Sequence, residues 1–168
     1  MFVGKTAGGS IRRSLLAFDL TALPEDAVID SVSLTLFVSQ TNSGLLTHTL
    51  HRALADWREG TSDAGGRGGG GASVTAGDAT RIHTFYSNSF SSAPGGDFVS
   101  TASASLPMGG EDQAYTFAST PQLVDDVQSW LDKPAQSFGW LIRGDESGGG
   151  TAKRLDSSEN SIPRIGLC

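Results

Sequence analysis

The chain has 168 residues, enough for one domain with a sizeable hydrophobic core, and we predict a single domain over residues 1–168. With 38% hydrophobic and 18% charged residues it is too apolar for a disordered chain, and its net charge of −6, without a basic cluster, disfavours nucleic acid and anionic membranes as partners. The single cysteine, Cys168, excludes an intrachain disulfide, and no apolar run reaches the roughly 18 residues that would predict a membrane-spanning helix.

Alternating apolar residues predict strands in the first third of the chain. In residues 14–20, and again in residues 31–38, apolar residues recur at every second position and therefore fall on one face of a strand. A third β run, 46–53, follows turn residues at 42–44. We therefore expect 31–38 and 46–53 to pair as an antiparallel hairpin.

Small residues dominate the segment from about 60 to 77, and six of the seven residues from 65 to 71 are glycine. This composition predicts a long Gly-rich loop, either functional or disordered. Short β runs follow at about 82–86, 100–106 and 113–118, separated by Gly-containing turns.

One short helix is predicted at about 121–132. Thr120 can cap it, Pro121 fits its first position, and Pro134 ends the pattern. Its apolar residues recur at helical spacing and are expected to lie on the sandwich; they are Leu123, Val127, Trp130 and Leu131.

Two further strands, 138–143 and 161–167, are expected after the helix. Many short strands with Gly-rich turns and one helix are typical of a β-sandwich or jelly roll. The predicted fold is therefore all-β: a jelly-roll-type antiparallel β-sandwich with one short helix and a long Gly-rich loop.

Several blocks of sequence, in order, resemble the disaggregatase-related, or DNRLRE, domain of bacterial secreted proteins. The main blocks are IRRSLLAFDL at 11–20, ADWREGT at 55–61 and AKRLDSSEN at 152–160, with shorter matches at 77–80, 83–86 and 94–98. The resemblance runs from about residue 3 to 164. It implies a secreted or cell-surface jelly roll with carbohydrate-binding character, often attached to polysaccharide-degrading enzymes.

Members of that family usually begin with a further strand before the counterpart of residues 2–4. The resemblance thus implies that this chain lacks its first strand. A sheet edge left without that strand would present unpaired N–H and C=O groups, so weak self-association through an exposed edge strand is expected.

Catalysis is not favoured by the residues. His48 and His51, three apart on a β run, face opposite sides and cannot form a two-histidine metal site. No nucleophile elbow, phosphate loop or zinc-protease motif occurs. Acidic neighbours could in principle serve a glycosidase, but solvated surface charge is the favoured interpretation, with Asp125 and Asp126 on the solvent side of the helix. The acidic pairs considered are Glu111 with Asp112, Asp125 with Asp126, Asp145 with Glu146, and Asp156 with Glu159.

A structural calcium ion is more plausible than catalysis, because turn loops supply the carboxylate and carbonyl oxygens that calcium binds. Asp145, Asp156 and Glu159 belong to oxygen-rich segments on either side of the glycine turn at 148–150. They are the candidate ligands. The alternative for Glu159 is an ion pair with Arg143 or Arg154.

Sugar recognition needs aromatic faces beside hydrogen-bonding groups. The candidate binding residues are Trp57, Arg58, Arg81, Tyr86 and Phe90. The arginines could serve an acidic polysaccharide such as a uronate. Core packing is the alternative for Trp57, and it is the expected role of Trp130 and Trp140.

The resulting hypothesis is a non-catalytic extracellular polysaccharide-binding module with no certain cofactor. One alternative is a structural or adhesion domain of a surface or matrix protein without sugar affinity, and a less favoured one is a polysaccharide-degrading enzyme. A binding module predicts exposed aromatic residues on one face or loop end, whereas a spacer predicts that all large aromatic residues are buried.

Overall fold

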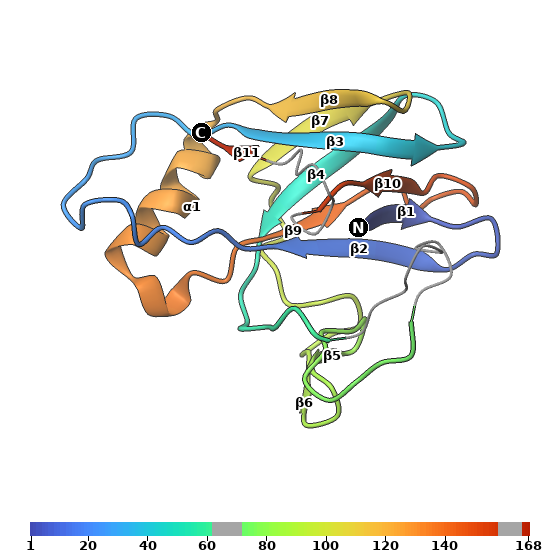
Figure 1. The fold of residues 1–168 in the computed structure, drawn as a ribbon, viewed down its shortest axis with the longest axis horizontal. Coiled ribbons are helices and arrows are strands. Elements are labelled where there is room, and N and C mark those ends of the chain that lie inside the picture. Colours follow the sequence, from blue (N-terminus) through green and yellow to red (C-terminus); the bar gives the residue numbers. More distant parts are fainter. Residues whose placement is uncertain (62–71, 158–165) are drawn as a thin grey trace.

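The computed structural model describes residues 1–61, 72–157 and 166–168 (Figure 1). Its helices are α1 (Pro121–Asp132) and a short 3-10 helix, η2 (Pro134–Gln136). Its strands are β1 (Phe2–Lys5), β2 (Ile11–Leu16), β3 (Leu34–Thr41), β4 (Leu46–Arg52), β5 (His83–Phe85), β6 (Ser89–Phe90), β7 (Ala104–Met108), β8 (Gln113–Phe117), β9 (Trp140–Arg143), β10 (Lys153–Leu155) and β11 (Gly166–Leu167).

The strands form two antiparallel layers in a jelly-roll arrangement. One layer has the order β8-β3-β10-β1, with β11 also paired to β3. The other has the order β2-β9-β4-β7, and the β1–β2 hairpin joins the two. The predicted fold class, an all-β sandwich with one helix, is confirmed.

The predicted hairpin between the second and third β runs is wrong. β3 pairs with β8 and β10, whereas β4 pairs with β7 and β9 in the other layer. The turn at 42–45 therefore carries the chain across the sandwich rather than back along the same sheet. Alternation correctly predicted which residues face the core, but both layers share that core, so it could not identify the pairing partner.

The core lies between the layers and beneath α1. Leu34, Leu36 and Val38 of β3 and Trp140 of β9 are fully buried. The helix begins as predicted: the Thr120 hydroxyl accepts a hydrogen bond from the Leu123 amide (3.1 Å), and Pro121 occupies the first turn. Its apolar stripe packs on one end of the sandwich, as expected. Trp130 and Trp140, the two tryptophans predicted to lie in the core, are both buried, and their ring centroids are 4.6 Å apart.

Asp126 corrects the expectation that both helix carboxylates face solvent. Asp125 is exposed, but Asp126 is only 6% exposed. Its Oδ2 accepts hydrogen bonds from Trp140 Nε1 (2.8 Å) and Ser103 Oγ (2.6 Å), and Arg52 Nε lies 3.5 Å from its Oδ1. Because a polar group can be buried when it is paired, this carboxylate ties α1 to β9 and to the segment before β7.

The segment 54–103 connects β4 to β7 and contains the small β5–β6 sheet, which lies outside the sandwich and next to β2 (Figure 1). Hydrogen bonds to the sandwich fix the chain at both ends of this segment. The Ala53 amide donates to the Gly139 carbonyl (2.9 Å), and the Ser103 amide donates to the Leu50 carbonyl (2.7 Å). This insertion brings loop residues to the outer face of the β2-β9-β4 layer.

Candidate functional site

Three polar side chains form a row across the outer face of β2, β9 and β4. Because Trp140 and Ile142 point into the core, Arg143 points outward from β9. Arg13 of β2 and Thr49 of β4 are its direct partners in the two strand registers. Arg13, Arg143 and Thr49 therefore lie side by side on one face of the sandwich.

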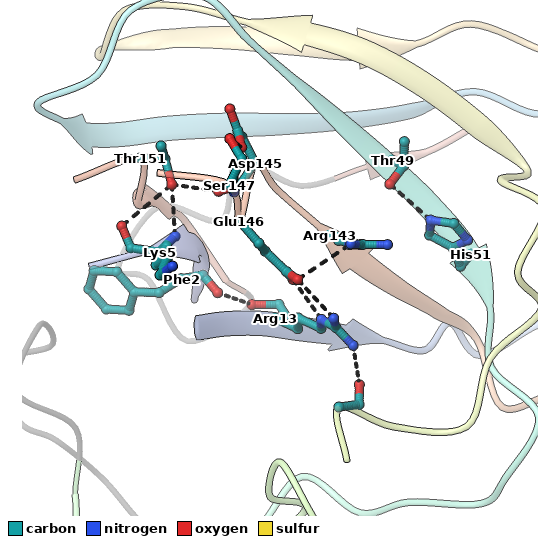
Figure 2. Close-up of polar contacts among 12 residues, drawn as sticks. Phe2, Lys5, Arg13, Thr49, His51, Arg143, Asp145, Glu146, Ser147 and Thr151 are labelled. Carbon is teal, nitrogen blue, oxygen red and sulfur yellow. Dashed lines mark hydrogen bonds and ion pairs between the residues drawn. The ribbon is translucent and has the colours of Figure 1, made fainter. Parts of the chain in front are cut away.

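Glu146 offsets the charge repulsion between Arg13 and Arg143, the two neighbouring arginines of this row. It follows β9 and accepts from Arg13 at 2.6 Å (Nε to Oε1) and 2.8 Å (Nη2 to Oε2), while Arg143 Nε lies 3.4 Å from Oε2 (Figure 2). The Arg13 hydrogen bonds are the main cause that lowers the pKa of Glu146. A carboxylate held ionised in this way orients guanidinium groups and is unsuited to act as a general acid.

Arg13 also fastens the insertion to the sheet. Its Nη1 donates to the Gly95 carbonyl (2.9 Å), and its guanidinium lies 5.5 Å from the ring centroid of Phe98. Gly95 has a φ of 105°, and a Cβ there would stand 2.3 Å from Arg13 Nη1. The turn at 94–97 therefore requires glycine at this position in order to receive the arginine.

His51 fixes the orientation of the Thr49 hydroxyl. His51 Nδ1 lies 2.9 Å from the Val99 carbonyl oxygen, which can only accept, so Nδ1 carries the proton. His51 Nε2 must then accept the hydrogen bond from Thr49 Oγ1 (2.9 Å; Figure 2). The Thr49 oxygen is left with lone pairs that can accept from a ligand hydroxyl.

A shallow groove of about 580 Å³ lies beside Arg143 and Thr49 of this row. We call it the sheet groove; its walls include Ile11, Thr47, Thr49, His51, Arg143 and Glu146. The Arg143 side chain is 44% exposed, and its terminal nitrogens bond to no residue that the structure describes. The sheet groove thus offers an oriented guanidinium donor next to a hydroxyl acceptor, a combination suited to a ligand that carries both acceptors and hydroxyl groups.

Trp57, Arg58 and Arg81 of the predicted sugar site line a second depression, the loop groove, together with Arg13 and Gly95. Trp57 is half-buried and donates from Nε1 to the Phe138 carbonyl (2.7 Å). Arg58 and Arg81 are exposed. The two grooves share Ile11, so they adjoin on the same side of the sandwich.

Tyr86 and Phe90, the other two predicted residues, lie on or beside the β5–β6 hairpin and do not line either groove. Both rings contact His83, with centroid distances of 5.0 Å and 4.4 Å. Phe90 is 68% exposed. The structure therefore brings three of the five predicted residues into one groove and places the remaining two in a separate aromatic cluster.

Asp78 holds the two described ends of the predicted Gly-rich loop. Its carboxylate accepts from the Thr61 amide (3.1 Å) and from the Thr75 amide (2.7 Å). Gly60 lies against it, since a Cβ there would be 1.6 Å from Asp78 Oδ1. Residues 62–71, the middle of that loop, are outside the described residues, as are residues 161–165 of the predicted last strand.

The two described calcium candidates, Asp145 and Asp156, lie toward opposite ends of β10. Asp145 accepts from the Ser147 amide (2.8 Å) and hydroxyl (2.6 Å), which lowers its pKa. Its backbone carbonyl receives the Thr151 hydroxyl at 2.5 Å, whereas Asp156 is buried past the other end of β10, roughly 16 Å of extended chain from Thr151. Glu159 lies outside the described residues. Within 1–61, 72–157 and 166–168, no group of three His, Cys, Asp or Glu side chains is placed to hold a metal ion.

Comparison with protein-family models, with curated proteins and with solved structures found no match. No helix within the described part of the chain is long and apolar enough to cross a membrane. The sheet groove was missed at the sequence level. Alternation alone indicates that Arg13 faces away from Ser14 and Leu16, but the strand order that sets it beside Arg143 comes only from the fold.

The two sandwich histidines predict a loss of stability in mild acid. Burial is the main cause that lowers the pKa values of His48 and His51 from 6.5. His48 is fully buried, and its Nε2 has no hydrogen-bond partner among the described residues. Below pH 6.5 the unfolded chain binds protons that the folded protein resists, so the free energy of unfolding falls as the pH decreases, by at most about 1.4 kcal/mol per pH unit for each histidine.

Chemical denaturation between pH 7 and pH 5 measures this effect. The double variant His48→Leu/His51→Gln should have a flatter profile than the wild type over the same range. Equal slopes for the two proteins would contradict the assignment of the pH dependence to these histidines.

Proposed function

We propose that this protein is a non-catalytic, extracellular polysaccharide-binding module of the DNRLRE type and that the polymer lies along the sheet groove and the loop groove. The supporting observation is that fixed hydrogen-bonding groups and a half-buried tryptophan line two adjoining grooves on one side of the sandwich. Arg143 and Thr49 supply the donor and acceptor in one groove, and Trp57 supplies a ring in the other.

The distribution of aromatic residues supports binding over a purely structural role. Trp130 and Trp140 are buried in the core, whereas Phe90 is largely exposed and Trp57 and Tyr86 are half-exposed, all within the insertion. Half-exposed rings also occur on the sandwich, at Phe2, Phe18, Phe37 and Tyr115, so the support for binding rests on the largely exposed Phe90. The lowered pKa of Glu146 supports a role in orienting arginines rather than in acid catalysis.

Affinity electrophoresis tests the proposal. The purified protein is run through native gels that contain a neutral glucan or polygalacturonate, each with calcium or with EDTA. We expect retardation by one of the polymers. Arg143→Gln should weaken that retardation about tenfold or more, because a charged hydrogen bond is worth roughly 1.5–3 kcal/mol. Trp57→Ala should weaken it as well.

Lys133→Gln is the matched control, because it makes the same change in charge at an exposed position after α1 that lines neither groove. It should migrate like the wild type. Sensitivity to EDTA would add a bound calcium ion to the proposal. Unretarded migration in every gel by a protein that circular dichroism shows to be folded would instead favour the structural or adhesion role.

A further inference from the structure

Lys153 is a fully buried lysine at one end of the sandwich. It lies on β10 between β1 and β3, its side chain is 0% exposed, and it points into the protein. Lysine is rarely buried unless its charge is paired or fully hydrogen-bonded. The surroundings of the ammonium group therefore need a physical explanation.

Five oxygen atoms surround the ammonium. They are Thr41 Oγ1 at 3.1 Å, Ser43 Oγ at 3.1 Å, and the carbonyl oxygens of Ser43 at 3.3 Å, Gly44 at 3.0 Å and Gly109 at 2.7 Å. We call this set the oxygen cage. Every member is neutral, and no carboxylate is among them.

The oxygen cage joins two turns that are far apart in the sequence. Thr41, Ser43 and Gly44 belong to the crossing from β3 to β4, and Gly109 belongs to the turn between β7 and β8. Thr41 and Ser43 also bond to each other through their hydroxyls (3.0 Å), so a contact that does not involve the ammonium helps to hold these two acceptors in place. One cation thus holds together two of the connections between the layers at this end of the sandwich.

The chemistry of the cage suits a monovalent cation. Neutral carbonyl and hydroxyl oxygens replace the hydration shell of potassium in ion channels. Calcium prefers charged carboxylate ligands, and the cage has none. Burial lowers the pKa of Lys153, as expected for a cation that is solvated by dipoles and has no paired anion among the described residues.

We propose that the oxygen cage is a monovalent-cation site whose resident cation is the ammonium group of Lys153. The lysine thereby acts as a tethered substitute for a structural ion. Because the acceptors belong to the two turns, the cage should still bind a small free cation when the tether is removed. This inference is independent of the proposed polysaccharide binding.

Chemical rescue tests it. Lys153→Ala should lower the melting temperature by about 10 °C, since it leaves buried oxygen acceptors without a donor and a cavity in place of the side chain. Methylammonium chloride, and to a smaller extent potassium chloride, should restore part of that loss in a saturable way. Tetramethylammonium chloride at the same ionic strength should not, because its four methyl groups keep the charged nitrogen out of direct contact with the cage oxygens. The wild type, whose cage is already occupied, should not distinguish the three salts.

Lys153→Met is the matched control. Its side chain fills the same space without a charge, so the variant should be destabilised without being rescued. Identical responses of Lys153→Ala to all three salts, or equal rescue of Lys153→Met, would overturn the proposal.

The wild-type protein provides a second measurement that does not depend on the folding of a variant. With lysine labelled by ¹⁵N, a buried ammonium bonded to the cage should give a side-chain NH₃⁺ resonance with slow hydrogen exchange at neutral pH, and Lys153→Met should remove that resonance. If no lysine in the folded wild type shows a slowly exchanging NH₃⁺ signal, the cage does not hold a bound cation and the proposal fails.

Discussion

Replacing Asp126 by alanine is expected to lower the free energy of unfolding by about 3 kcal/mol. The change removes the acceptor of the Trp140 and Ser103 hydrogen bonds. Each buried donor left unsatisfied costs about 1–3 kcal/mol. It also takes the carboxylate away from Arg52, which is partly exposed and can return to water, so that part of the loss is small.

The neighbouring residue provides the control. Asp125→Ala removes an exposed carboxylate from the same turn of α1 and should change stability by about 0.5 kcal/mol or less. Urea denaturation of both variants, with Trp fluorescence as the probe, measures the difference. Equal stabilities for Asp125→Ala and Asp126→Ala would mean that the buried carboxylate does not hold the helix on the sandwich.

Asp126 also shows what sequence reasoning could and could not predict about the helix. The Thr120 cap, the proline start and the apolar spacing are local features, and they gave the correct position and orientation of α1. The partner of a buried carboxylate is not local. Trp140 and Ser103 lie 14 and 23 residues away from Asp126, and only the packing of the helix on β9 brings them together.

The same distinction between local features and contacts made by distant residues applies to the sheet. Alternation identified the inward residues of β3 and β4, because the side-chain period of a strand is a local property. It could not predict that β3 and β4 lie in different layers. The row of Arg13, Arg143 and Thr49 depends on that strand order, as does the oxygen cage around Lys153, which draws on two separate turns.

Only some of the predicted sugar-binding residues share a groove, again because their positions depend on the path of the chain in the fold. Trp57 and Arg58 are adjacent in sequence, so their presence in one groove is unsurprising, whereas Arg81 joins them through the path of the insertion. Tyr86 and Phe90 looked equivalent by composition. The β5–β6 hairpin turns both toward His83 instead.

Gly139→Ala is expected to be as disruptive as the loss of Asp126, with a decrease of about 3 kcal/mol or more in the free energy of unfolding. Gly139 precedes β9 and has a φ of 76°, in the left-handed region that disfavours side chains. A Cβ there would lie 1.8 Å from the Leu16 carbonyl oxygen and 2.9 Å from the Ala17 Cα. Both contacts are with backbone, so relief requires β2 and β9 to separate, and strain and overpacking of this kind each cost about 1–3 kcal/mol.

Gly148→Ala separates this effect from the general consequence of replacing a glycine. Gly148 lies in the exposed turn after β9, and a Cβ there would have no neighbour within 4 Å. Its melting temperature should stay close to that of the wild type, whereas that of Gly139→Ala should fall by roughly 6–12 °C. Because β2 and β9 carry Arg13 and Arg143, a surviving Gly139→Ala protein should also be less retarded by the polysaccharide that retards the wild type. Wild-type stability and retardation in Gly139→Ala would mean that the close contact of these two strands does not set the geometry of the sheet groove.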